Sequence, residues 1–184
     1  MAQLDVLFTG YVGDRVAGTV SLVRSQGLAA IVDPGMVPGR NAILDSLRAL
    51  SMSPEDVTDV ILSHHHPDHT VNVALFPDVR IHDHWAVYEA DLWTSRPAEG
   101  LHLAPGVSLL ETPGHTPQDV TTLVDTPDGV VALTHLWWHE SAESDPLAWD
   151  LDQLHVHRSR VLDIARRIVP GHGPAFDVGP DTPR

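Results

Sequence analysis

The sequence contains no cysteine and no lysine among its 184 residues. Without cysteine, the chain has no disulfide framework, no thiolate nucleophile and no cysteine-ligated metal. Without lysine, it has neither Schiff-base chemistry nor the phosphate-binding lysine of a P-loop. Any catalytic chemistry must therefore come from other side chains.

Positive charge is also scarce, because 11 arginines stand against 25 acidic residues and leave a formal net charge of -14. This balance disfavours nonspecific binding to nucleic acid or to an anionic membrane. No apolar run approaches the length of a transmembrane helix, and the N-terminus lacks a basic region followed by a long apolar stretch. We therefore expect a cytoplasmic protein that acts on a small-molecule substrate, with no nucleic-acid or membrane partner. An exposed tryptophan-rich face would support a homodimer.

Apolar spacing gives a coarse outline of the secondary structure. It predicts strands at residues 3–9, 19–24, 28–33, 57–63, 78–82, 107–112, 119–125 and 129–135. It also predicts helices at 41–50 and at about 152–168, with short helical segments after residues 67 and 84. The length suggests one domain, which we expect to cover residues 1–178, with a frayed tail at 179–184.

The most informative segment, SHHHPDH at residues 63–69, directly follows a predicted buried strand. If the extended backbone continues, His64 and His66 point the same way and can share one metal ion. Pro67 is typical of the first turn of a helix, so Asp68 and His69 should have a different aim and could serve a second ion. Imidazole and carboxylate groups are ligands that zinc prefers.

This segment resembles the H-x-H-x-D-H signature of the metallo-β-lactamase superfamily. Three further segments are similar to motifs of that family, namely VDPG at 32–35, TPGHT at 112–116 and PGHG at 170–173. Residues 57–77 and 168–176 look most like the small group called metallo-β-lactamase domain-containing protein one and its bacterial relatives. The resemblance implies an α/β (α+β) fold, specifically a four-layer αββα sandwich with metals along one edge of the two sheets.

The resemblance also implies roles for individual residues. It implies two sets of metal ligands, His64, His66 and His115 for a first ion, and Asp68, His69 and His172 for a second. Asp68 would also be catalytic, because it could orient a metal-bound hydroxide or pass a proton to the leaving group. Asp33 is expected to support a ligand histidine from behind. Apart from the resemblance, Asp119 lies four residues past His115 and could either hydrogen-bond a ligand histidine or begin a strand with no special role.

One position departs from the family pattern. The family's bridging ligand is an aspartate at the end of a strand, where this chain has His135 after the strand at 129–134. A neutral imidazole offers one lone pair, so we expect His135 to be a terminal ligand and the second ion to be held less tightly. Two zinc ions are expected, with a single ion as the alternative. Asp145, Asp150 and His139 are further candidates for a replacement ligand.

The function implied is that of a metal-dependent hydrolase, with zinc as the expected metal. Its metal-bound hydroxide would attack a small ester, thioester, lactone or phosphodiester. The alternatives are a mononuclear iron dioxygenase of the same fold and a metal-binding protein without turnover. Trp137 should share the face of His135 while Trp138 points away, so Trp137 could line the substrate pocket, with core packing as the equal alternative. His139 is a further candidate for that pocket, with plain solvent exposure as its alternative.

Overall fold

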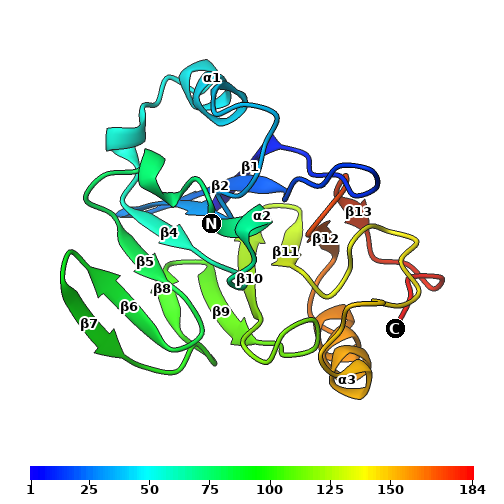
Figure 1. The fold of residues 1–184 in the computed structure, drawn as a ribbon. Coiled ribbons are helices and arrows are strands. Elements are labelled where there is room, and N and C mark those ends of the chain that lie inside the picture. Colours follow the sequence, from blue (N-terminus) through cyan, green and yellow to red (C-terminus); the bar gives the residue numbers. More distant parts are fainter.

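The first of two β-sheets is formed by the N-terminal half of the chain. A computed structural model describes residues 1–184 and places seven strands in this sheet, in chain order: β1 (Gln3–Phe8), β2 (Val20–Ser25), β3 (Leu28–Val32), β4 (Asp59–Ile61), β5 (Arg80–His82), β6 (Ala86–Glu89) and β7 (Leu92–Ser95). β3, β4 and β5 run parallel, with Ile31 opposite Val60 and Val60 opposite Ile81. The other neighbours in this sheet are antiparallel. Figure 1 shows the sheet in blue to green.

The second sheet is formed by the C-terminal half. Its order is β13-β12-β11-β10-β9-β8. The strands are β8 (His102–Ala104), β9 (Val107–Glu111), β10 (Val120–Thr126), β11 (Gly129–Thr134), β12 (Arg167–Pro170) and β13 (Phe176–Asp177). β11 and β12 are parallel, so the chain leaves both at the same edge of the sheet.

Three apolar clusters explain why the two sheets pack together with helices outside them. Between the sheets, Val23, Val32 and Ile61 of the first pack with Leu109 and Leu133 of the second. α1 (Asn41–Ala49) covers the outer face of the first sheet, and α3 (Leu151–Leu162) covers the second (Figure 1). The predicted αββα sandwich is confirmed.

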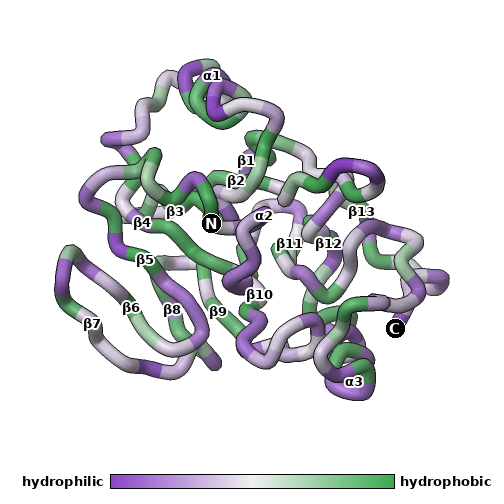
Figure 2. The backbone as a smooth tube through the Cα atoms, viewed as in Figure 1, coloured by the Kyte–Doolittle hydropathy of each residue, from purple (hydrophilic) through white to green (hydrophobic).

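Two short 3-10 helices, η1 (Pro54–Asp56) and η2 (Val73–Leu75), and the short α2 (Pro67–Thr70) complete the secondary structure. Figure 2 shows the hydrophobic β4 giving way to hydrophilic chain around α2, where the buried strand ends and the polar segment begins. None of the helices combines the length and apolar character that a membrane span needs.

The structure corrects two predicted elements. The segment after residue 84 is not helical but forms the β6–β7 hairpin, because Tyr88 and Trp93 pair across the strands with ring centroids 4.7 Å apart. The helix predicted at 152–168 ends at Leu162. Residues 167 and 168, which the prediction placed at the end of this helix, lie in β12. Ile168 and Val169 are both buried, and such a short apolar run does not distinguish a helix from a central strand. Strands β8 and β13 were not predicted.

Two of the last six residues contact the second half of the molecule. The indole Nε1 of Trp137 donates a hydrogen bond to the carbonyl oxygen of Pro183 at 2.8 Å. The His155 ring nitrogen Nδ1 lies 2.5 Å from the carbonyl oxygen of Arg184. The segment that we expect from the sequence to fray thus has contacts with both α3 and the chain after β11.

Candidate metal centre

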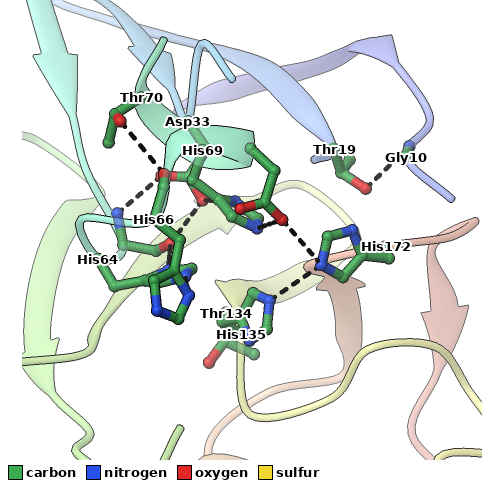
Figure 3. A network of polar contacts seen from close by, with 12 residues as sticks. Gly10, Thr19, Asp33, His64, His66, His69, Thr70, Thr134, His135 and His172 are labelled. Atoms are coloured by element: carbon green, nitrogen blue, oxygen red, sulfur yellow. Dashed lines mark hydrogen bonds and ion pairs between the residues drawn. The ribbon is translucent and has the colours of Figure 1, made fainter. Parts of the chain in front are cut away.

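Histidine side chains from both sheets meet where several strands end (Figure 3). His64 and His66 follow β4, and His69 lies in α2. His115 lies between β9 and β10, while His135 and His172 follow the parallel strands β11 and β12. The shared direction of those two strands explains why residues 37 positions apart in sequence have ring nitrogens only 3.1 Å apart.

The first predicted ligand set is assembled. His64 Nε2 and His115 Nε2 each lie 3.0 Å from His66 Nδ1. A tetrahedral zinc ion with Zn–N bonds of about 2.0–2.1 Å places its ligand atoms about 3.3 Å apart. Both distances are close to that value, and all three nitrogens lie within 4.8 Å of one another, so the three histidines could hold one ion. His66 is exposed, so this set is accessible to solvent.

The second predicted set lies next to it. Asp68 Oδ2 is 3.5 Å from both His69 Nε2 and His172 Nε2. His135 Nε2 lies 3.1 Å from His172 Nε2, and its ring centroid is 4.1 Å from that of His115. His135 thus stands between the two sets, with a ring nitrogen beside the second. Gly171 makes room for it, because a Cβ atom there would lie 2.4 Å from His135 Cδ2.

A single carboxylate orients two of the ligands in the N-terminal half. Asp33 Oδ2 accepts hydrogen bonds from the Ser63 hydroxyl at 2.6 Å and from His69 Nδ1 at 3.0 Å. The Ser63 hydroxyl in turn accepts from His64 Nδ1 at 2.9 Å. With protons held on both Nδ1 atoms, the two Nε2 lone pairs are available to a metal. Asp33 has φ 53°, a left-handed conformation uncommon outside glycine.

Two other ligands have acceptors of their own. His115 Nδ1 lies 2.7 Å from Asp145 Oδ2, and His172 Nδ1 lies 2.9 Å from the carbonyl oxygen of Ala17. Each of these contacts again leaves Nε2 facing the cluster. His135 Nδ1, in contrast, is buried without a hydrogen-bond partner.

The electrostatics favour neutral imidazoles, which is the form that binds metals. Burial, followed by the neighbouring histidines, lowers the pKa of His64 and of His135 well below the usual value of 6.5. Burial also lowers the pKa of His66 and of His172. In addition, His69 Nε2 is buried with no hydrogen-bond partner. Convergent ring nitrogens, one of them unsatisfied, together with the Asp68 carboxylate, fit divalent cations.

The two tryptophans after His135 have the opposite orientation from that predicted. Trp137 is completely buried against α3, with the Arg158 guanidinium 5.2 Å from its ring centroid, so it does not line a substrate pocket. Trp138 is the one that faces the cluster, with its ring centroid 6.0 Å from that of His172 and 6.4 Å from that of His135. The prediction assumed that the strand continues, but β11 ends at Thr134 and the alternation of side chains ends with it.

The remaining predicted residues lie near the cluster with other roles. The Asp119 carboxylate accepts from the Thr116 backbone amide at 2.8 Å and from its hydroxyl, so it holds the turn after His115 and not a histidine ring. Burial raises the pKa of Asp119 to about 6, although the hydrogen bonds from Thr116 oppose this shift. His139 contacts Ser141, and Asp150 caps α3 by accepting from the Gln153 amide.

Sequence reasoning missed the supports of the C-terminal half. Asp145 was considered only as a replacement ligand, whereas its carboxylate contacts the far side of the His115 ring. No motif surrounds Asp145, and the acceptor for His172 is a backbone carbonyl that any residue could supply. A cavity of about 740 Å³ is lined by none of the ligands, because it lies at the opposite ends of β11 and β12.

Comparison with known proteins gives the family. The profile of the metallo-beta-lactamase superfamily matches residues 13–175. A metallo-beta-lactamase domain-containing protein 1 from Xenopus laevis is 32% identical over 96% of this chain and 82% of its own length. Its human counterpart is 35% identical over 80% of this chain and 59% of its own length. An N-acyl homoserine lactonase from a Bacillus species is 31% identical over 62% of this chain and 54% of its own length.

Solved structures agree with the fold. A putative metallo-beta-lactamase from Thermotoga maritima superposes with a TM-score of 0.75 at 21% identity, covering 96% of this chain and 99% of that one. A protein in a di-iron-bound form has a TM-score of 0.70 at 24% identity, covering 94% and 95%. A dizinc quorum-quenching lactonase has a TM-score of 0.68 at 18% identity, covering 91% and 79%.

The chain therefore belongs to the metallo-β-lactamase superfamily, whose members bind divalent metals. N-acyl homoserine lactonases, which share this fold, are among its relatives.

Proposed function

We propose that the protein is a zinc-dependent hydrolase of a small ester, thioester, lactone or phosphodiester. The observation that carries this proposal is the pair of adjoining ligand sets, with the Asp68 carboxylate beside them. Asp68 Oδ2 lies 3.5 Å from two ligand nitrogens, and its side chain remains 18% exposed. Divalent ions bound there would supply Lewis acidity and lower the pKa of a coordinated water.

The side chains of the site have distinct roles in this proposal. His64, His66 and His115 would hold the first ion, and the partly exposed Asp68 would accept a proton from the attacking water and return it to the leaving group. His135 is a terminal ligand beside His172. Two zinc ions are expected, and a single ion is the alternative, because Asp68 is the one carboxylate among the proposed ligands.

We further propose a cytoplasmic protein with a small-molecule substrate and no nucleic-acid or membrane partner, and a homodimer is the assembly to test. Lactones are the first substrates to test, because the lactonase relatives provide a defined assay class. The proposal of a dimer has its own measurement, the molar mass in solution.

The decisive experiment measures metal identity and stoichiometry per chain by elemental mass spectrometry on untagged protein, followed by hydrolysis assays. The panel contains a lactone, an ester, a thioester and a phosphodiester, each tested with zinc-loaded, metal-depleted and Asp68→Asn protein. We expect zinc, and turnover that depends on both zinc and Asp68. One iron per chain with oxygen uptake would instead indicate the oxygenase. Metal binding without turnover across the panel would indicate a noncatalytic protein.

A further inference from the structure

The chain between β11 and α3 contacts the His115 turn at three points. The Trp149 amide donates to the carbonyl oxygen of His115 at 3.0 Å, and the Asp150 amide donates to that of Gly114 at 3.1 Å. The third contact is the one between Asp145 Oδ2 and His115 Nδ1, at 2.7 Å. Backbone and side-chain contacts together hold both the position of this histidine and the rotation of its ring.

Asp145 is itself fixed in place. Its carboxylate is completely buried, and its other oxygen accepts from the Leu147 amide at 2.8 Å. The Ala148 amide closes a turn onto the carbonyl oxygen of Asp145 at 3.2 Å. The carboxylate therefore has little freedom to turn away from His115, which is what an orienting group requires.

Arg158 of α3 binds the chain between β11 and α3, the connection that contains Asp145. It is completely buried, and its guanidinium donates to the carbonyl oxygens of Leu136 and Glu143, both at 2.9 Å. These two carbonyls lie at the start of the connection and two residues before Asp145. The position of Asp145 is thus set by a packed helix, although the residue itself lies in a loop.

We propose that Asp145 is the positioning residue of the first metal site. It keeps the proton of His115 on Nδ1 and turns Nε2 towards His66 Nδ1, which lies 3.0 Å away. The carboxylate also makes the imidazole a stronger donor to a cation, because it stabilises the charge that the ring shares with the metal. This inference rests on the proposed function only in that the site binds a metal, and it does not depend on the substrate.

Asp119 provides a matched comparison. It is also a buried aspartate close to His115, but its carboxylate accepts from Thr116 and does not contact the imidazole. Replacing Asp119 should disturb the turn and the stability of the fold, while the His115 proton stays on Nδ1. Asp152, exposed in the first turn of α3, serves as a control for the loss of one negative charge.

The test compares Asp145→Asn and Asp145→Ala with the parent protein, Asp119→Asn and Asp152→Asn. Zinc affinity is measured by competition with a chromophoric chelator, and the histidine protons are observed by NMR. We expect Asp145→Ala to weaken the affinity for the first ion by about 10–100-fold. Asp145→Asn should lose less, because its amide oxygen can still accept from Nδ1 when the hydrogen bond from the Leu147 amide is given up. The His115 Nδ1 proton signal should disappear in Asp145→Ala and persist in Asp119→Asn.

Asp145→Ala that folds normally, by circular dichroism, and binds zinc as tightly as the parent would overturn the proposal. So would an equal loss of affinity in Asp119→Asn and Asp145→Ala, since that result would indicate a general effect of the turn. If Asp145→Ala fails to fold, the nearly isosteric Asp145→Asn decides by the same criteria. A protein that loses zinc affinity as expected but hydrolyses nothing would contradict the proposed function and leave this inference intact.

Discussion

The two sheets contribute to the ligand cluster in different ways. The first sheet supplies its ligands from one continuous run at 64–69, and one carboxylate, that of Asp33, orients both His64 and His69. The second sheet supplies three histidines from three separate connections. Two of these have acceptors of their own, and the third, His135, has none for its Nδ1.

In the N-terminal half, where Asp33 supports two ligands, the backbone around these ligands is also closely packed. A Cβ atom on Gly35 would lie 1.6 Å from the carbonyl oxygen of Asp68, and the amides of Gly18 and Met36 both donate to that oxygen. A change in this half should therefore affect several ligands together. Because the C-terminal ligands are held separately, a single position such as His135 can differ from the family pattern without disturbing its neighbours.

The largest effect should come from removing the shared support. Asp33→Asn keeps the size of the side chain but replaces one accepting oxygen with an amide that can only donate. Oδ1 of Asp33 accepts from the Ser63 backbone amide at 2.7 Å, and Oδ2 accepts from the Ser63 hydroxyl and from His69. Whichever way the amide turns, at least one of these hydrogen bonds is lost, and the support of His64 and His69 is weakened. We expect the affinities of both ions to fall by about 10–100-fold, together with a loss of about 1–3 kcal/mol in the stability of the metal-free protein.

Zinc titration and chemical denaturation of metal-depleted protein measure these two effects. Asp45→Asn, on the exposed face of α1, is the control and should change neither. Loss of only one ion would show that the two ligands of this half are not coupled through Asp33.

A smaller effect, in the opposite direction, should follow from restoring the family pattern in the C-terminal half. His135→Asp introduces a second carboxylate beside two cations, and a carboxylate can bridge them through two oxygens. The affinity for the second ion should rise by at least about tenfold, which corresponds to about 1.4 kcal/mol. Chelator competition followed by elemental analysis measures it. His135→Ala is the matched control and should weaken the binding of that ion. An affinity of His135→Asp for the second ion that is unchanged or lower would contradict the bridging argument.

The same difference between the halves determines what could be predicted from the sequence. The run at 64–69 is continuous in sequence, so the alternation of an extended chain and the helix-starting Pro67 are enough to divide its ligands into two sets. The structure brings His115, His135 and His172 to the same place, but their proximity depends on sheet topology. Their roles were inferred from the resemblance to family motifs and could not be derived from spacing.

The wrong and missing predictions from the sequence have one physical cause. Trp137 and Trp138 were assigned to the wrong faces because β11 ends at Thr134, and Ile168 was placed in a helix because β12 is buried on both faces. Asp145 was not recognised as a support because its contact with His115 joins residues 30 apart in sequence. In each case tertiary packing decides a conformation that local pattern leaves open.

The smallest predicted effect concerns a second carboxylate that contacts the N-terminal run of histidines, that of Asp83. Asp83 Oδ2 lies 3.1 Å from Nε2 of His65, the residue between two proposed ligands, and accepts from the Tyr88 hydroxyl at 2.7 Å. Burial alone would raise the pKa of Asp83, but the hydrogen bonds from His65, Tyr88 and two backbone amides outweigh it and lower the pKa from 3.8 to about 2. The ionised carboxylate therefore stabilises the fold at neutral pH, and this contribution disappears as the pH falls through 3.8 towards 2.

Asp83→Asn should accordingly cost about 1–2 kcal/mol of unfolding free energy at pH 7, and the difference from the parent should shrink steadily below about pH 4. Denaturation of metal-depleted protein between pH 3 and 7 measures it, with Asp45→Asn again as the exposed control. A difference that stays constant or grows on acidification would show that Asp83 acts by packing and not by charge. Because His65 points away from the cluster, zinc affinity should change less than in Asp33→Asn. An equal change would mean that the hairpin of β6 and β7 orients the metal ligands as strongly as Asp33 does.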